Sequence, residues 1–265
     1  MHKYKVFDVN WHPTVNEQFK DYKRNTPVNQ RTFLDTMHFD VIGSNMVGLP
    51  NIGDYSHDGF YNLVRPFLDT GKNFYTVPFI GKNDSIDHQI FKGKYAVCLK
   101  VHPRFICQNF LDVDWNLVAG ICSQYNLALG ICTYFDEEKI SAKSLQEICL
   151  IIDRIIQKKI KIILFHGFGN YFSYFYSIFG DNRNILFDTS FSLLRCTKEV
   201  FDNYCEALNS DRRNICFGSD FPDNNLDDHL NVVNSMCNRI HSYAATNFLS
   251  DNAIDFFERI KNGFQ

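Results

Sequence analysis

The stretch Ile215-Cys216-Phe217-Gly218-Ser219-Asp220-Phe221-Pro222 is a short apolar run that ends abruptly at a carboxylate. Three earlier apolar runs also end in residues capable of chemistry: Val6-Phe7-Asp8-Val9-Asn10-Trp11-His12, Val97-Cys98-Leu99-Lys100-Val101-His102 and Ile162-Ile163-Leu164-Phe165-His166-Gly167. In a parallel barrel the carboxyl ends of the strands meet at one mouth. The four runs therefore predict histidines and an aspartate around a common centre, which would bind a metal or move protons.

Working outward from this stretch, we find eight short runs rich in Val, Ile and Phe. Their nearly continuous hydrophobicity is typical of strands that are covered on both faces. The expected strands are Tyr4–Val9, Phe39–Gly43, Phe74–Phe79, Tyr95–Val101, Leu127–Thr133, Lys161–Phe165, Asn184–Thr189 and Asn214–Gly218. Amphipathic stretches between and after them predict helices over Ser144–Lys158 and Asn225–Ile240, and a last one that Ser250-Asp251-Asn252 caps and that runs through Ile260.

Successive strand ends are roughly 30 residues apart, which is the length of one strand–helix unit. Eight such units predict an α/β fold, a (β/α)8 TIM barrel with room for distortion, as a single domain over residues 1–265. An open doubly wound sheet is the alternative. No Gly-x-Gly-x-x-Gly motif or phosphate loop follows the first strand, which disfavours a nucleotide-binding fold.

Composition narrows the partners and the compartment. The formal net charge of −3 provides no basic field for nucleic acid, and no run reaches the roughly 20 apolar residues of a membrane span. No signal peptide is evident, and the nine cysteines include no Cys-x-x-Cys pair. We therefore expect a cytoplasmic protein whose partner is a small-molecule substrate, with neither nucleic acid nor membrane. A homo-oligomer is compatible with the sequence.

The strand ends supply the candidate site residues, which are Asn10, His12, Lys100, His102, His166 and Asp220. Side chains two residues apart on a strand share a face, so Asn10 and His12 point the same way, as do Lys100 and His102. Imidazoles with a carboxylate suit Zn²⁺ or a similar ion, and an aspartate beside such an ion could accept a proton from bound water. Arg104 is suited to binding a substrate carboxylate in a bidentate manner.

Each of these residues also has a structural interpretation. Asp220 could cap a turn, and His166 could be a core histidine hydrogen-bonded to the backbone. His12 before a proline is similar, and His102 could belong to a simple turn. Lys100 is different, because burying an ammonium group in an apolar strand is costly without a partner. Taken together, the residues favour a functional site.

The same motifs resemble the amidohydrolase superfamily, specifically its amidohydrolase-2 (aminocarboxymuconate-semialdehyde decarboxylase-like) branch. The resemblance rests on Asp8–His12, Leu99–Pro103, Phe165–Gly169 and Phe217–Pro222, in the right order along nearly the whole chain. It implies a distorted TIM barrel, one divalent metal that is often Zn²⁺, and either hydrolysis of amides, esters or lactones or decarboxylation of aromatic and related acids.

Carried over by position, His12 matches the second histidine of the family's first-strand pair, and His166 and Asp220 match its sixth- and eighth-strand residues. Asn10 stands where the first histidine belongs, and Cys132 stands where the fifth-strand histidine is expected. An asparagine amide is a poor zinc ligand, whereas a cysteine thiolate is a good one. The resemblance thus implies either a metal held by His12, Cys132 and Asp220, or no metal. In the first case His166 lies beside the metal-bound water, one position stays open for substrate, and Asn10 is a further candidate ligand.

The leading hypothesis is a hydrolase of a small polar substrate that works with or without a metal. Asp220 would be the general base and His166 would polarise the scissile carbonyl or the water, while Lys100, His102 and Arg104 would bind a substrate anion. The alternatives are a carboxy-lyase of the same family and a non-catalytic barrel whose metal site has decayed.

Overall fold

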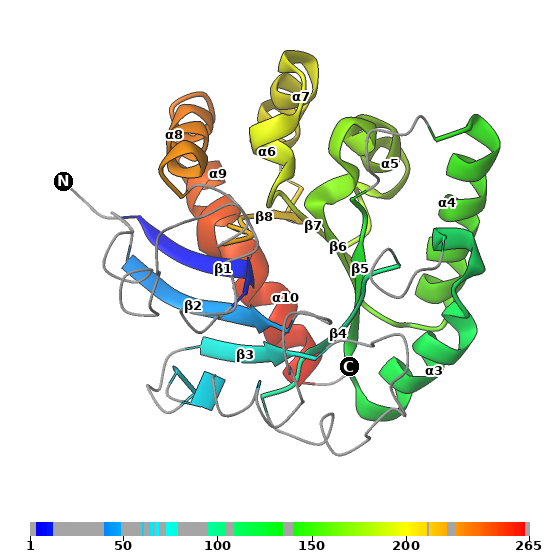
Figure 1. Cartoon of the computed structure of the whole chain (residues 1–265). Helices are drawn as coiled ribbons and strands as arrows, with labels where there is room; N and C mark the ends of the chain where they lie inside the picture. The colour runs from blue at the N-terminus through cyan, green and yellow to red at the C-terminus, as the bar shows by residue number, and fades with distance from the viewer. Residues whose placement is uncertain are drawn as a thin grey trace, which may run out of the picture.

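The computed structural model describes residues 4–12, 40–48, 60, 64–65, 67–68, 73–78, 95–103, 109–134, 140–210, 212–221 and 226–262. Its strands form two parallel sheets (Figure 1). The first contains β1 (Lys5–Trp11), β2 (Asp40–Val47) and β3 (Asn73–Val77). The second contains β4 (Cys98–Val101), β5 (Ala128–Cys132), β6 (Ile162–Phe165), β7 (Ile185–Asp188) and β8 (Ile215–Cys216).

Backbone contacts join the two sheets at both of their meeting points. Between β3 and β4, Thr76 bridges Ala96, and the amide of Lys100 donates to the carbonyl of Pro78 at 2.8 Å. Between β1 and the segment after β8, Trp11 bridges Phe221. The eight strands therefore close into a ring, and the predicted TIM barrel is confirmed over the open doubly wound sheet.

The barrel is distorted on the side where the ring closes. The pairing of β1 with β2 shifts register twice, between Val6 and Phe7 and between Asp8 and Trp11. The predicted eighth strand Asn214–Gly218 pairs only over Ile215–Cys216. Register shifts re-aim side chains at the rims of barrels, and here they set the direction of the first-strand site residues.

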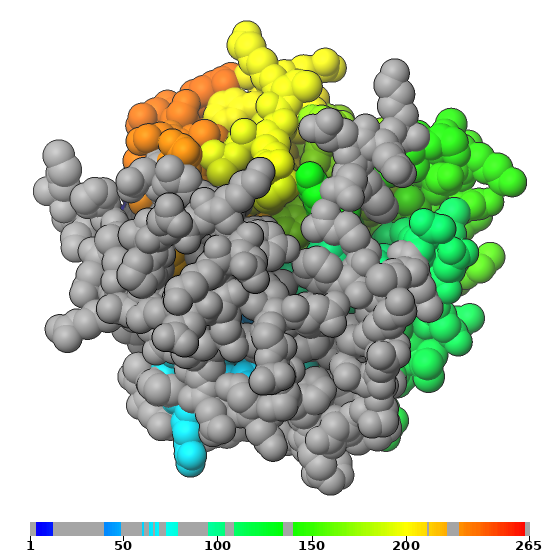
Figure 2. Space-filling model, viewed as in Figure 1, coloured from blue at the N-terminus to red at the C-terminus, as the bar shows by residue number. Residues whose placement is uncertain are grey.

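Helices stand around the outside of the strands (Figure 1). They are α3 (Trp115–Tyr125), α4 (Ala142–Gln157), α5 (Phe172–Phe179), α6 (Ser192–Arg195), α7 (Lys198–Asn209), α8 (Leu226–Cys237), α9 (Ser242–Thr246) and α10 (Asn252–Lys261). Side chains cap several of them: Asp114, Ser141 and Thr197 accept backbone amides at the starts of α3, α4 and α7. In the space-filling view α7 and α8 form the upper edge of the face shown, in yellow and orange (Figure 2).

Helix α10 covers the amino-terminal end of the barrel. The ring of Phe257 stacks on Phe7 with 5.6 Å between centroids, inside a cluster of fully buried side chains from the strand interiors. The amide of Asn126, just before β5, donates to the carbonyl of Ile260 at 3.1 Å. Lys161, just before β6, donates to the same helix. This end is therefore packed, and the opposite end carries the site.

The predicted helices are also present, with shifted ends. Ser144–Lys158 corresponds to α4 and Asn225–Ile240 to α8, while the last predicted helix is α10, which begins at Asn252 after a π-helical turn over Asn247–Asp251.

Candidate active site

The carboxyl ends of β1, β4, β6 and the segment after β8 bring together five of the predicted residues. Asn10, His12, Lys100, His166 and Asp220 are all buried, and hydrogen bonds or charge interactions connect them. Polar groups this deep in a protein need partners. The prediction that these strand ends share one centre is therefore confirmed by their geometry.

Asp220 lies at the centre of this group. Its Oδ1 accepts hydrogen bonds from Asn10 Nδ2 at 2.8 Å and from His12 Nε2 at 3.3 Å, and its backbone amide donates to the carbonyl of Asn10 at 2.7 Å. Burial acts to raise the pKa of this carboxyl group, but His166, His12 and Lys100 outweigh it and hold the pKa well below the ordinary value. Asp220 is therefore ionised at neutral pH.

Asn10 connects the groups around Asp220. Its Oδ1 accepts from the ammonium of Lys100 at 3.3 Å, while its Nδ2 donates to Asp220 Oδ1 and to Ser190 Oγ, both at 2.8 Å. Lys100 also lies over the ring of Phe165, 4.3 Å from its centroid. An amide contact and an aromatic face thus hold a cation that is only 3% exposed.

His12 contacts both Asp220 and the backbone of β2. Its Nδ1 contacts the carbonyl oxygen of Val47 at 2.9 Å, and a carbonyl can only accept, so Nδ1 carries a hydrogen. Its Nε2 lies 3.3 Å from Asp220 Oδ1. His12 therefore places an imidazole directly beside the carboxylate.

His166 is surrounded by apolar rings and by the backbone of β7's loop. Tyr134 and Phe191 both meet its ring edge-on, at 6.2 and 5.8 Å between centroids. Its Nδ1 contacts the carbonyl oxygen of Ser190 at 3.2 Å. Burial lowers the pKa of His166 to about 4, despite the opposing charge of Asp220, so the imidazole is neutral at pH 7.

Two further buried carboxyl groups flank the site, and the predicted residue set did not include them. Asp8 Oδ1 accepts the backbone amides of Asn10 and Ser219, and Asp188 accepts those of His166 and Ser190. Burial raises the pKa of Asp8 to about 6 and that of Asp188 to about 7. Ser190 was also missed. The signal that would have found Asp8 and Asp188 is a charged residue inside an apolar strand, which is the signal that identified Lys100.

Strained backbone marks the same place. Among the described residues, the non-glycine positions with positive φ include His166 (67°), Phe191 (62°) and Asp220 (54°), all at the mouth. Such conformations persist only where the surroundings hold them, and they cluster at functional sites.

The residues at the mouth do not fit a divalent metal. Among the residues described, no group of three His, Cys, Asp or Glu side chains could hold a metal ion. The predicted ligands His12 and Asp220 are paired with each other, and Asn10 presents its NH₂ group to the carboxylate while a lysine cation occupies its oxygen. Like charges disfavour a second cation here. The predicted zinc site with His12, Cys132, Asp220 and Asn10 is therefore not assembled.

The remaining predicted residues are Cys132, His102 and Arg104. Cys132 is buried at the end of β5, opposite Phe165 of β6, and belongs to no metal-binding group among the described residues. His102 is buried just beyond β4. Arg104 lies outside the described residues.

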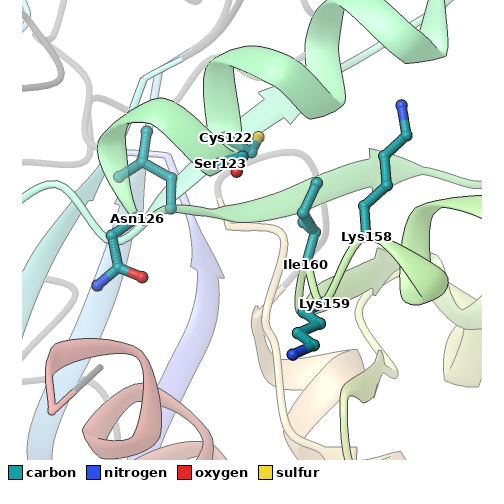
Figure 3. A pocket seen from close by; sticks show the side chains of 7 residues that line it. Cys122, Ser123, Asn126, Lys158, Lys159 and Ile160 are labelled. Atoms are coloured by element: carbon teal, nitrogen blue, oxygen red, sulfur yellow. The ribbon is translucent and has the colours of Figure 1, made fainter. Parts of the chain in front are cut away.

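A cavity of about 230 Å³ lies at the opposite end of the barrel, where α3 and α4 end before β5 and β6 (Figure 3). Its lining includes Ser123, Asn126, Lys158 and Lys159, and the two lysine side chains point in opposite directions. The cavity therefore contains none of the predicted site residues. Within the described part of the chain, no helix has the length and apolar character needed to cross a bilayer.

The closed ring and the polar mouth define a TIM barrel with a candidate active site in the position usual for that class. No protein-family model matches the chain, and no curated protein matches it. Solved structures do. An uncharacterised TIM-barrel protein from Bordetella bronchiseptica has a TM-score of 0.71 at 12% identity, over 99% of this chain and 100% of that one.

Two other solved structures have known or assigned reactions. A probable 2-pyrone-4,6-dicarboxylic acid hydrolase of Acinetobacter baumannii, with citric acid bound, has a TM-score of 0.65 at 12% identity, over 96% of this chain and 99% of that one. A 2,6-dihydroxybenzoate decarboxylase from Rhizobium has a TM-score of 0.58 at 12% identity, over 97% and 99%. The likeness to these solved structures establishes the fold.

Proposed function

We propose that the mouth is the active site of a hydrolase that cleaves a small polar ester, lactone or amide with its own acid and base groups. The observation that carries the proposal is the ionised, buried carboxylate of Asp220, held by Asn10 and His12 beside the cation of Lys100. A fixed base next to fixed positive charge is the arrangement that hydrolysis of a carbonyl compound requires.

In the proposed reaction Asp220 takes a proton from a water molecule, whose oxygen forms a bond to the carbonyl carbon. The ammonium of Lys100 stabilises the negative charge that develops on the carbonyl oxygen. The tetrahedral intermediate then expels the leaving oxygen or nitrogen as the C–O or C–N bond breaks. We assign the transfer of a proton to the leaving group to His12, whose Nε2 lies 3.3 Å from Asp220 Oδ1.

We also propose a role for the predicted anion-binding residues and a cellular compartment. Lys100, with His102 and Arg104, would receive an anionic group of the substrate. The eight cysteines that are described are free thiols, which supports the reducing, cytoplasmic setting that we propose. Related barrels include both a hydrolase and decarboxylases, so the product must be identified in any test.

The first prediction follows from Asp220. Purified protein, treated with EDTA and checked by elemental analysis, is screened against lactones, esters and amides, with product identified by mass spectrometry. We expect hydrolysis that EDTA does not reduce and that Asp220→Asn lowers by at least about 100-fold, the scale of a lost general base. Exposed Asp112 provides the control, since Asp112→Asn should retain full turnover.

Three outcomes would count against the proposal. Release of carbon dioxide would identify a carboxy-lyase, and activity that disappears with EDTA and returns with Zn²⁺ would restore the metal hypothesis. Unchanged hydrolysis in Asp220→Asn would show that another group is the base.

A further inference from the structure

We propose that Ser190 and Asp188 are positioning residues that hold the imidazole of His166 in one tautomer, with its hydrogen on Nδ1. The Nε2 atom then accepts a hydrogen bond from the attacking water and cannot donate one to the substrate carbonyl. The role of water rests on the proposed function, whereas the tautomer rests on the hydrogen-bond geometry around a neutral imidazole.

The hydroxyl group of Ser190 makes three contacts, and their directions can be assigned. It lies 2.8 Å from Asn10 Nδ2 and 3.1 Å from His166 Nδ1, and it also contacts Asp188 Oδ2. A hydroxyl has one hydrogen and two lone pairs. The amide nitrogen of Asn10 only donates, so it takes one lone pair, and Asp188, once it is ionised above its pKa of about 7, accepts the hydrogen. The remaining lone pair faces His166, whose Nδ1 must therefore carry a hydrogen.

The backbone of Ser190 gives the same answer independently. Its carbonyl oxygen, which can only accept, lies 3.2 Å from His166 Nδ1. Two acceptors of the same residue thus surround this nitrogen. A neutral imidazole has one N–H, so Nε2 has the free lone pair.

Asp188 fixes the position of both partners. Its Oδ1 accepts the amide of Ser190 at 2.9 Å, and its Oδ2 accepts the amide of His166 at 3.2 Å as well as the Ser190 hydroxyl. The carboxyl group therefore ties the end of β7 to the start of the loop after β6. Rotation of the Ser190 hydroxyl would break its contact with Asp188.

The orientation of the Asn10 amide, on which the assignment depends, is itself determined. Its Oδ1 faces the ammonium of Lys100, and its Nδ2 faces Asp220 Oδ1. A flipped amide would set NH₂ against a cation and oxygen against a carboxylate, so only one orientation makes both bonds. The chain of donors thus runs from Lys100 through Asn10 to Ser190 and Asp188.

The consequence concerns the water that attacks the substrate. Among the described residues His166 Nε2 makes no hydrogen bond, and His166 is 6% exposed. The carboxylate of Asp220 and the Nε2 lone pair are then two acceptors, one for each hydrogen of the water. The sequence suggested that His166 polarises either the scissile carbonyl or the water. An Nε2 without a hydrogen can act only on the water.

Nitrogen NMR of the full chain tests the tautomer without a substrate. Protein labelled with ¹⁵N-histidine is recorded near pH 8, above the pKa of about 7 of Asp188, and the His166 signals are identified by their loss in His166→Gln. We expect Nδ1 at the protonated shift and Nε2 at the unprotonated shift. The reverse pattern in wild-type protein overturns the proposal, whether or not any variant folds.

Variants test whether the hydroxyl acts through His166. Ser190→Ala should give a detectable fraction with hydrogen on Nε2 and lower kcat at least about tenfold with little change in KM, since orientation and not binding is lost. Thr189→Val is the matched control, because its hydroxyl bonds the carbonyl of Cys216 and does not touch the site. An unaltered His166 spectrum in Ser190→Ala overturns the positioning role. Absence of any hydrolysis by wild-type protein would refute the proposed function and leave the NMR result standing.

Discussion

At the scale of single residues, Asn10 explains why this mouth differs from a metal centre. Each polar hydrogen and the oxygen of its amide is used, by Asp220, Ser190 and Lys100. A histidine there could offer at most one donor and one acceptor, and could not join all three. The asparagine at position 10 and the buried Lys100 cation therefore depend on each other. Asn10 accepts a hydrogen bond from Lys100 and donates one to Asp220, so it links the cation to the carboxylate.

Gly218 is the residue whose lack of a side chain makes room for this network. A Cβ atom there would lie 2.1 Å from Asp188 Oδ1 and 3.1 Å from Ser190 Cβ. No Cβ can occupy that position unless the carboxylate moves. Gly218 is therefore required because the end of β7 packs against it, and not because its own backbone needs a conformation that favours glycine.

We predict that Gly218→Ala displaces Asp188 and destabilises the protein by about 1–3 kcal/mol, the usual cost of overpacking. Turnover should fall as well, because Ser190 and His166 lose their anchor. Urea unfolding measures the first effect. Gly120→Ala is the control, since a Cβ there meets nothing within 4 Å in α3, and alanine favours a helix by about 1 kcal/mol. Equal effects of the two substitutions would contradict the steric argument.

At the scale of elements, the sequence predicted the ring of strands because its signal is local. Each strand is a short apolar run, and burial on both faces is visible in residue type alone. The pairing length of β8 was not predictable, because Phe217 continues the apolar run of Ile215 and Cys216. In the fold the backbone amide of Phe217 donates to the carbonyl of Phe248.

The same reasoning explains which site residues were found. His12, His166 and Asp220 follow apolar runs directly, so their position at the mouth follows from the fold. Cys132 also ends its strand, yet ligation requires distances between strands that no sequence pattern contains. Ser190 gained its importance from three partners, on β1, on β7 and just after β6, which only the folded chain brings together.

Helix α10 supplies the element-scale prediction. Phe257 is fully buried against Phe7 and Tyr75, with 5.6 Å between centroids in each pair. We expect Phe257→Ala to destabilise the protein by about 3–5 kcal/mol, because it opens a cavity at the packed end of the barrel. Tyr243→Ala, at a ring that is 49% exposed, should cost much less in the same urea titration. A small effect of Phe257→Ala would mean that α10 does not close the barrel.

At the scale of the whole molecule, four buried ionisable groups are neutral in the folded chain over much of the acidic range. Burial raises the pKa of Asp8 to about 6 and of Asp188 to about 7, and it lowers the pKa of His166 and of His229 to about 4. Between roughly pH 4 and 6 the unfolded chain ionises the two acids and protonates the two histidines, so their effects on stability oppose each other. The net contribution of these four groups to the free energy of unfolding should therefore change little with pH across this range.

Removing one of the four groups reveals its contribution to the pH dependence of stability. His229 on α8 is suitable because its ring packs against Phe217, behind the mouth. Below its ordinary pKa of 6.5 the unfolded chain binds a proton at this histidine, whereas the folded chain does not until about pH 4. The free energy of unfolding of the wild type should thus fall relative to that of His229→Phe as the pH drops through this window. At about 1.4 kcal/mol per pH unit, the relative change between pH 7 and 5 is about 2 kcal/mol. Urea unfolding at both pH values measures it, and Asn231→Gln, exposed on the same helix and without a titrating group, should give a constant difference. A constant difference for His229→Phe too would mean that this ring is protonated equally in the folded and unfolded chains.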